Sequence, residues 1–406
     1  MNTRKCCAFV LVLLLLFPVA VLAQDDATDE AMDEVQMGAW ETCETPDNLP
    51  EEINLGVIYS LSGPISVYGG PQQQAVQLAL EEINGSAYLG EGTTLTAIFE
   101  DSAGDAEQAI NAMTKLVEED GVVAVLGPTL STEAFSADPI AQENGTPVMG
   151  TSNTAIGITD MGDFVFRDSL PEASVIPGTI AQSVEILGLE RVGVLYGDDD
   201  DFTLSGYDVF IEALDENGIE IVGEETFSRE DVDFSAQLTN LLNNDPDALI
   251  VSALSAEAVQ IIIQARDLGF EGAIIGGNGF NSPDTIEQTG EASEGVIVGA
   301  AWNVASTNPY SEAYETAYEE AYGNAPDQFA TQAYTGAWLF ATAIRCANSA
   351  ERSDIRDALA AITDLETPLG TFSFSETRDP IHDPVVQIVQ DGAFAVLGAE
   401  DMEESE

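Results

Sequence analysis

From residue 54 onward, short runs of apolar and β-branched residues alternate with longer segments in which apolar residues recur every three or four positions. The short runs predict buried strands, and the longer spacing predicts amphipathic helices. In the first block we expect strands at residues 56–61, 95–100, 122–126 and 147–149, and helices at 71–84 and 106–119. Strand alternating with helix predicts a parallel sheet covered by helices on both faces.

The same alternation begins again near residue 175. Helices are expected at residues 175–187, 206–217, 234–242 and 256–268, and strands at 191–196, 219–225, 248–253 and 273–276. Because each block is long enough to bury a core of its own, the sequence predicts two α/β lobes.

The C-terminal quarter of the chain is too poor in strands to form a third lobe of this kind. We expect helices at residues 310–322, 330–347 and 355–361, and strands at 370–374 and 385–390. These elements are best used to complete both lobes, so the chain must cross between the lobes more than once. Several crossings form a hinge, and a hinge between two lobes creates a cleft. In open α/β sheets, ligands bind outside the carboxyl ends of the strands.

The N-terminus has the pattern of a secretory signal peptide. Arg4 and Lys5 precede an apolar run at residues 8–22 that ends in small residues before an acidic stretch. The run is short for a permanent membrane anchor, although the flanks leave an uncleaved anchor open as the alternative. Gln24 follows the expected cleavage point, so no lipid-bearing cysteine stands there. We predict a signal peptide at 1–23, an acidic flexible leader at 24–52, an acidic tail at 400–406, and a soluble protein in the periplasm or outside the cell.

The charge of the chain excludes one class of partner. With 72 acidic and 11 basic residues, the formal net charge is −61, and a phosphate backbone would be repelled. A disordered acidic chain is also excluded, because 45% of the residues are hydrophobic and supply enough apolar surface for a core. Self-repulsion of this size is reduced by salt, so we interpret the acidity as an adaptation to a saline habitat.

The residues most often used in catalysis and metal binding are sparse. The sole histidine, His382, lies between two prolines in a segment that predicts a turn or hinge, and no P-loop, GxSxG or HExxH motif occurs. The acidic run at residues 198–201 lacks the spacing of a calcium loop. Beyond the signal peptide, Cys43 and Cys346 are the remaining cysteines, and export permits a disulfide between them. We predict no enzyme, no cofactor and no metal, with the Cys43–Cys346 bridge left open.

Short polar residues follow three strands of the first block. Ser62 and Tyr68 come after the first strand, Ser131 after the third, and Ser152, Asn153 and Thr154 after the fourth. Hydroxyl groups and helix N-terminal amides together hold small anions such as a carboxylate. Any one of these loops would also suit an ordinary helix cap or turn. Three of them at one sheet edge favour a binding site.

These loops also carry a resemblance to a known family. The stretch Gly56–Pro64 with Tyr68-Gly69 resembles the first loop of the periplasmic Leu/Ile/Val-binding proteins, which serve ABC importers. The similarity continues, in the same order, through Leu126-Gly127-Pro128, Ser152-Asn153-Thr154, Asp233-Phe234-Ser235, residues 264–269 and Val389–Gly392. It spans residues 54–397.

The resemblance implies a type I periplasmic-binding-protein architecture with two doubly wound parallel-sheet lobes joined by a multi-strand hinge. It implies a first lobe at 53–171 and 302–380, and a second lobe at 172–301 and 381–399. The implied function is capture of a small solute by hinge closure, with an ABC permease as partner and the protein acting as a monomer. A ligand-sensing module of the same fold is the alternative.

The resemblance also implies roles for individual residues. In the first lobe, Ser131 would hold a ligand carboxylate with help from Ser152 and Thr154, and Tyr68 would border the side-chain pocket. The second lobe departs from the family, because Asn278 stands where an acid usually binds an ammonium group. Glu172 falls at the lobe crossing, where many members carry an aspartate, and would compensate for the missing acid. Phe202 keeps the ring of an aromatic position without its hydroxyl, and Leu254 falls near a frequent tyrosine. The expected ligand is an amino acid, with a carboxylate lacking an ammonium group, or an amide, left open.

Overall fold

The computed structural model describes residues 35–229 and 231–398, so the predicted signal peptide and acidic tail lie outside the described residues. The first sheet has the strand order β2-β1-β3-β4-β5, and all of its neighbouring strands are parallel. Its strands are β1 (Glu52–Tyr59), β2 (Thr94–Asp101), β3 (Ala124–Leu126), β4 (Val148–Gly150) and β5 (Val165–Arg167).

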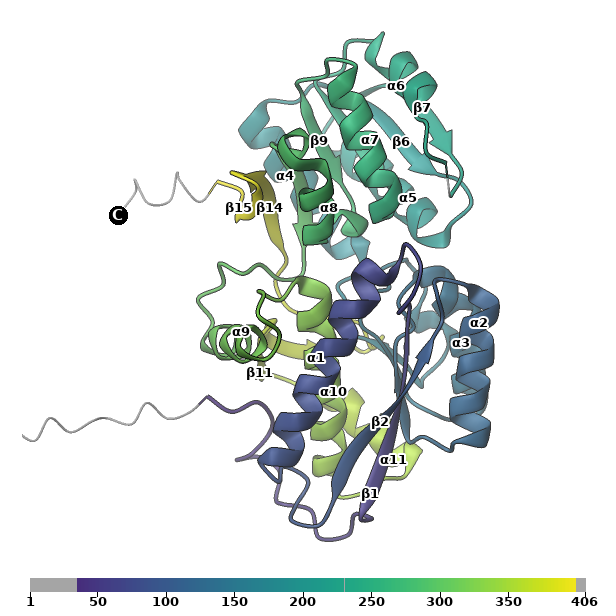
Figure 1. Cartoon of the computed structure of the whole chain (residues 1–406), viewed down its shortest axis with the longest axis vertical. Coiled ribbons are helices and arrows are strands. Elements are labelled where there is room, and N and C mark those ends of the chain that lie inside the picture. The colour runs from purple at the N-terminus through teal and green to yellow at the C-terminus, as the bar shows by residue number, and fades with distance from the viewer. Residues whose placement is uncertain (1–34, 230, 399–406) are drawn as a thin grey trace, which may run out of the picture. The chain divides into compact units, whose positions relative to one another are not determined.

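Helices cover both faces of this first sheet (Figure 1). One face packs against α1 (Ser66–Gly85) and α10 (Gln328–Ala347), with α9 (Pro309–Tyr322) and α11 (Arg352–Ala360) joining the same core. The other face packs against α2 (Ala106–Thr114), the π-helical turn that follows it (Lys115–Glu119), and α3 (Ser131–Glu143). A small antiparallel sheet completes this lobe with β11 (Leu365–Thr367), β12 (Gly370–Phe374) and β13 (Pro380–Ile381).

The second large sheet has the order β15-β14-β10-β9-β8-β6-β7. Its parallel strands are β6 (Arg191–Gly197), β7 (Glu220–Phe227), β8 (Ala248–Ser252), β9 (Ala273–Gly276) and β10 (Val296–Ala300). The late strands β14 (Val385–Gln390) and β15 (Ala393–Val396) are antiparallel. The fold class predicted from the sequence, two α/β lobes, is therefore confirmed, with an antiparallel edge added to the second sheet.

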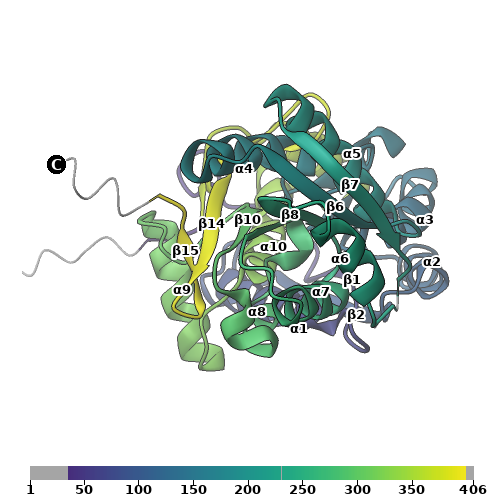
Figure 2. The same cartoon turned by 90° about the horizontal axis from the view of Figure 1, so that it is seen from above.

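Helices also cover both faces of the second sheet (Figure 2). On one face lie α4 (Glu172–Leu187) and α5 (Asp201–Glu216), and on the other lie α6 (Ser235–Leu242), α7 (Ser255–Asp267) and α8 (Pro283–Thr289). Short 3-10 turns occur at Thr159–Met161, Asn278–Phe280 and Gly290–Ser293.

The chain crosses between the two large sheets at three places. It leaves the first sheet after β5, returns after β10, and crosses again between β13 and β14. The late strands thus complete the second sheet, and of the two the sequence predicts β14 but not β15.

His382 lies in this third crossing, where its ring stacks on Phe372, and burial lowers the pKa of the imidazole to about 4.

Several elements differ from the sequence-based expectation. Helix α1 begins at Ser66 and contains Pro71, which the pattern had placed at the helix start. The pattern did not predict α3, whose buried face includes the polar residues Glu133 and Asp138 and therefore lacks a clear apolar period. It also missed β5, which has 3 residues, together with α8 and β10.

The prediction of a flexible leader is wrong for residues 35–51. A disulfide joins Cys43 to Cys346 on α10, and Arg345 Nε donates a hydrogen bond to the Cys43 carbonyl at 2.9 Å. The Arg345 guanidinium also lies over the Trp40 ring, 4.9 Å from its centroid. The main-chain N–H of Ala39 donates to the Tyr88 hydroxyl at 2.8 Å. The segment is polar in composition, but these contacts with α10 and with Tyr88, in the loop after α1, hold it on the first lobe.

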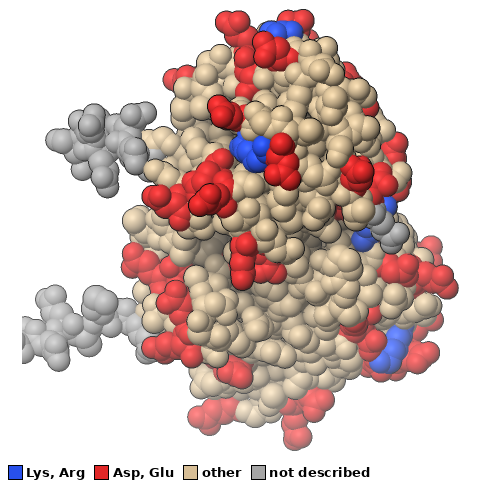
Figure 3. Space-filling view, turned by 45° about the horizontal axis from the view of Figure 1, so that its top comes forward, with Lys and Arg blue, Asp and Glu red and all other residues tan. Residues whose placement is uncertain are grey.

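Acidic side chains are spread over the face shown in Figure 3, and Lys and Arg side chains are few there. Several arginines bind main-chain carbonyls as well as, or instead of, carboxylates. Arg352, for example, donates to the carbonyls of Val122 and Val117. The surface charge is therefore largely unpaired, which leaves screening by salt as the main way to reduce its repulsion.

Candidate ligand-binding site

A small cavity lies at the carboxyl ends of the strands, between residues of both lobes. Its volume is about 20 Å³, space for little more than one water molecule. Its lining residues are Tyr68, Thr129, Leu130, Ser131, Ser152, Phe202, Leu254, Asn278, Gly279 and Phe329. Most of the residues that the sequence predicts for the site are in this group. Because both lobes line so small a space, a ligand can enter only if the lobes separate.

Ser131 is the first residue of α3 and is almost fully buried. Its Oγ accepts hydrogen bonds from the main-chain N–H groups of Thr154 and Ala155, each at 3.2 Å. These two donors occupy the oxygen, so the hydroxyl proton is left to be donated elsewhere. Placed at a helix N-terminus, where the helix dipole is positive, this proton is suited to a carboxylate.

The loop after β4 is held by its own side chains. Ser152 Oγ donates to the Thr129 carbonyl at 2.7 Å and accepts from Gln72 Nε2 at 2.9 Å. Asn153 Nδ2 donates to the Pro128 carbonyl at 2.8 Å. The buried Thr154 Oγ1 has no hydrogen-bond partner in the structure. Asn153 Oδ1 is likewise buried without a partner, so Asn153 and Thr154 both have hydrogen-bonding capacity left, whereas the Ser152 hydroxyl is used within the protein.

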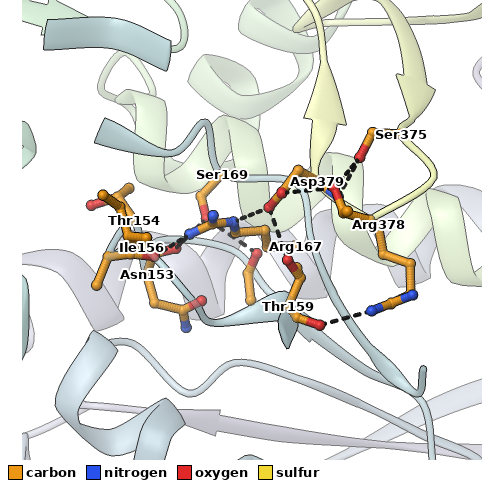
Figure 4. A network of polar contacts seen from close by, with 12 residues as sticks. Asn153, Thr154, Ile156, Thr159, Arg167, Ser169, Ser375, Arg378 and Asp379 are labelled. Carbon is orange, nitrogen blue, oxygen red and sulfur yellow. Dashed lines mark hydrogen bonds and ion pairs between the residues drawn. The ribbon is translucent and has the colours of Figure 1, made fainter. Parts of the chain in front are cut away.

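A buried arginine holds the loop after β4 in place (Figure 4). Arg167 at the end of β5 donates from Nη1 to the Ala155 carbonyl at 2.7 Å, and its Nε pairs with Asp379 at 2.6 Å. Ser169 Oγ donates to the Asn153 carbonyl at 2.8 Å. The Arg167–Asp379 ion pair joins residues more than 200 positions apart, so the sequence did not predict it. The signal that the sequence does carry is an arginine in a chain with few basic residues.

Tyr68 connects the two lobes through its hydroxyl group. From α1 it donates to the Gly279 carbonyl at 2.8 Å and accepts from the Ser255 N–H at 2.7 Å, both in the second lobe. Burial raises the pKa of the phenol, which keeps it protonated as the first of these bonds requires. Its ring packs against Phe329, with 4.7 Å between centroids.

Apolar side chains from both lobes close the rest of the cavity. Phe202 near the start of α5 and Leu254 before α7 belong to one cluster with Tyr68, Leu130 and Phe329. The sequence predicts the first two and Tyr68, but it does not predict Phe329, which reaches the cavity from the start of α10. This wall favours an apolar ligand side chain.

A second contact between the lobes lies beside the cavity. Thr132 Oγ1 donates to Asp200 Oδ2 at 3.0 Å and accepts from the Asp201 N–H at 3.1 Å. Asp200 is the N-cap of α5, since its Oδ1 accepts from the N–H groups of Phe202 and Thr203. Burial raises the pKa of this carboxyl above its ordinary value. The acidic run at residues 198–201 thus includes a helix cap that touches the first lobe.

Glu172 lies behind Asn278, at the start of α4. The residue is 2% exposed, Oε1 accepts the Asn278 N–H at 3.5 Å, and Oε2 has no hydrogen-bond partner. Burial raises its pKa to about 8. Two glycines make room for the carboxyl, because a Cβ at Gly206 or Gly277 would come within 2.9 or 2.8 Å of its oxygens.

Ser62 is the predicted residue that the structure places away from the others. It is exposed, and its partner is Asp101, whose pKa it helps to lower. Within residues 35–229 and 231–398, no cluster of three or more His, Cys, Asp and Glu side chains is arranged to hold a metal ion. In the same ranges, no helix has the length and apolar character needed to span a membrane.

Comparison with known proteins places this geometry in a family. A family described as "Periplasmic binding protein" matches residues 52–393. The chain is 26% identical over 335 residues to the Leu/Ile/Val-binding protein homolog 3 of Brucella melitensis, covering 81% of this chain and 88% of that protein. It is 25% identical over 337 residues to the leucine-, isoleucine-, valine-, threonine-, and alanine-binding protein of Pseudomonas aeruginosa, covering 81% and 87%.

Solved structures agree with the sequence matches. The leucine-binding protein LivK of Thermotoga maritima has a TM-score of 0.80 and 27% identity, covering 86% of this chain and 99% of that one. The substrate-binding protein LivJ of Streptococcus pneumoniae in complex with isoleucine has a TM-score of 0.79 and 28% identity, covering 85% and 98%. The resemblance seen in the sequence is confirmed, and the chain belongs to the periplasmic binding protein family.

Proposed function

We propose that this protein is the extracytoplasmic solute-binding component of an ABC importer. It captures an amino acid or a related small carboxylate or amide in the cavity between its lobes. The observation that carries this proposal is the composition of the cavity wall, where Ser131 and Tyr68 of the first lobe face Phe202, Leu254 and Asn278 of the second. Relatives with named ligands, such as the isoleucine complex of LivJ, support a solute of this size.

The first lobe binds the carboxylate end of the solute. The Thr154 N–H donates a hydrogen bond to Ser131 Oγ, which joins the two residues. The Ser131 hydroxyl proton and the unpartnered Thr154 Oγ1 therefore belong to one local group. A hydrogen bond from a hydroxyl to a carboxylate is charge-assisted and stronger than a neutral one. Closure then brings the apolar wall over the side chain of the solute.

Closure is favoured by the solute because some contacts exist only when the lobes meet. The Tyr68 hydrogen bonds to Gly279 and Ser255 and the Thr132–Asp200 hydrogen bond join residues of different lobes. A ligand that contacts both walls shifts the equilibrium toward this closed arrangement by its differential affinity for the two states. The closed form would then dock on a membrane permease.

The site is suited to binding rather than to catalysis. A nucleophilic serine needs a neighbouring base that takes its proton. The partners of Ser131 Oγ are instead two main-chain N–H groups, which donate hydrogen bonds to the oxygen. The Ser152 proton is already donated to the Thr129 carbonyl.

A thermal-shift screen tests the proposal. The panel contains amino acids, their amides, 2-oxo acids, short-chain acids and aromatic acids at millimolar concentration. Binding to the folded state raises the melting temperature by mass action, so a true solute produces a shift that grows with concentration. If no member of the panel shifts the melting temperature, the proposed function is wrong.

A further inference from the structure

A chain of five side-chain amides runs from the lobe crossings to the cavity. Asn303 Nδ2 donates to Gln387 Oε1 at 2.6 Å, and Gln387 Nε2 donates to Asn281 Oδ1 at 2.7 Å. Asn281 Nδ2 lies 3.3 Å from Asn278 Oδ1, and Gln328 Nε2 donates to the same oxygen at 2.5 Å. Asn303 follows the second crossing, Gln387 follows the third, and Asn278 lines the cavity.

Main-chain groups fix the orientation of these amides. Gln328 Oε1 accepts the Ala301 N–H at 3.0 Å, so Nε2 must face Asn278. Asn281 Nδ2 donates to the Gly299 carbonyl at 2.9 Å, so its Oδ1 must face Gln387. An N–H group only donates and a carbonyl only accepts, and each therefore selects one of the two ways in which an amide can be placed.

The side-chain oxygen of Asn278 is consequently occupied by other amides of this chain. Oδ1 receives N–H groups from Gln328 and Asn281, which leaves Nδ2 directed toward the first lobe, 3.4 Å from the Ser152 carbonyl. Ser152 and Asn278 both line the cavity. The second lobe therefore presents a hydrogen-bond donor at the point where it faces the carboxylate site.

We propose that this fixed donor selects a carboxylate whose neighbouring carbon carries an oxygen acceptor, the 2-oxo acid class with an apolar side chain, over the corresponding amino acid. The inference rests on the proposed function. An ammonium group placed beside Asn278 Nδ2 would meet a second donor and compete with it for the Ser152 carbonyl. A 2-oxo oxygen accepts a hydrogen bond from the same half-buried amide, so Asn278 Nδ2 can bond the ligand and the Ser152 carbonyl together.

Glu172 does not remove this preference. It is absent from the wall of the cavity and lies behind Asn278, whose main-chain N–H contacts its Oε1 at 3.5 Å. Burial raises the pKa of its carboxyl to about 8, so with no cation beside it the group is largely protonated at neutral pH.

Calorimetric titration of matched pairs tests the inference. Leucine is compared with 4-methyl-2-oxopentanoate, and valine with 3-methyl-2-oxobutanoate, because each pair differs only at the carbon next to the carboxylate. We expect the 2-oxo acid to bind at least tenfold more tightly in each pair. Amino acids that bind as tightly or more tightly overturn the inference and leave the proposed function standing. If neither member of either pair binds, the inference is wrong. If, in addition, no compound of the thermal-shift panel raises the melting temperature, the proposed function is wrong as well.

Two variants test the role of the amide orientation. Asn278→Asp keeps the shape and replaces the donor by an acceptor, so the preference should reverse toward the amino acid. Gln328→Glu places an acceptor against Asn278 Oδ1 and should turn the Asn278 amide over. The ratio of the affinities for the 2-oxo acid and the amino acid should then fall by about tenfold, although residue 328 itself does not line the cavity. Gln288→Glu, which adds the same charge at an exposed position on α8, should leave the ratio unchanged. An unchanged ratio in Asn278→Asp, or in Gln328→Glu if the former fails to fold, overturns the inference.

Discussion

Tyr68→Phe removes a single oxygen that joins the lobes. The oxygen makes two hydrogen bonds to the second lobe, to Gly279 and Ser255, while the ring retains its contact with Phe329. A hydrogen bond contributes about 0.5–1.5 kcal/mol net, so losing both should destabilise the closed arrangement by roughly 1–3 kcal/mol. Since 1.4 kcal/mol corresponds to a factor of ten, the affinity for the solute should fall by roughly 5- to 150-fold.

The same change should affect the unfolding of the ligand-free protein much less. When the lobes are apart, water replaces the lost partners, and the phenol oxygen contributes little to either lobe alone. Calorimetric titration with the tightest solute of the panel gives the affinity, and urea unfolding gives the stability. Tyr207→Phe is the matched control, because its hydroxyl bonds Glu224 within the second lobe. Unchanged affinity, or an equal loss of unfolding free energy without ligand, would refute closure through Tyr68.

Three further predictions concern the carboxylate site, a buried acid and the surface. Ser131→Ala should weaken solute binding by about 1–3 kcal/mol, measured by calorimetry, whereas Ser183→Ala, a buried serine on α4, should not change it. Burial raises the pKa of Glu133 from 4.5 to about 7, so its contribution to the free energy of unfolding is greatest below pH 4.5 and falls by about 3 kcal/mol as the pH rises to 7. Glu133→Gln should remove that fall in urea titrations across this pH range, and an unchanged pH profile would contradict it. Finally, the melting temperature should rise steeply with NaCl concentration, because salt screens the repulsion between the unpaired acidic side chains. A melting temperature that does not change with NaCl would contradict adaptation to a saline habitat.

The residues of the first lobe were within reach of sequence analysis. Each lies within a few positions of a predicted strand end, and the carboxyl ends of parallel strands meet at one edge of the sheet. Ser131, Ser152 and Tyr68 therefore come together in the structure as local reasoning expects. Ser62 obeys the same rule of position, but its side chain faces Asp101 and solvent, and nothing in a local pattern distinguishes that direction.

The remaining contacts depend on how distant segments pack. Phe329 enters the cavity from α10, and Asp379 reaches Arg167 from the connection between β12 and β13, so neither contact is visible in the periodicity of the sequence. The orientation of Asn278 depends on Gln328 and Asn281, which belong to different lobes. Likewise, the polar composition of residues 35–51 conceals the disulfide and the Arg345 contacts that hold them.

Energy transfer between dyes on the two lobes tests the central claim most directly. Gln108 on α2 and Ala236 on α6 are both exposed and lie in different lobes, and each is replaced by cysteine for labelling while Cys43 and Cys346 stay paired. Titration with the tightest solute of the panel should raise the transfer efficiency along the same curve as the calorimetric binding isotherm. Binding heat without any change in transfer efficiency would contradict capture by closure of the lobes.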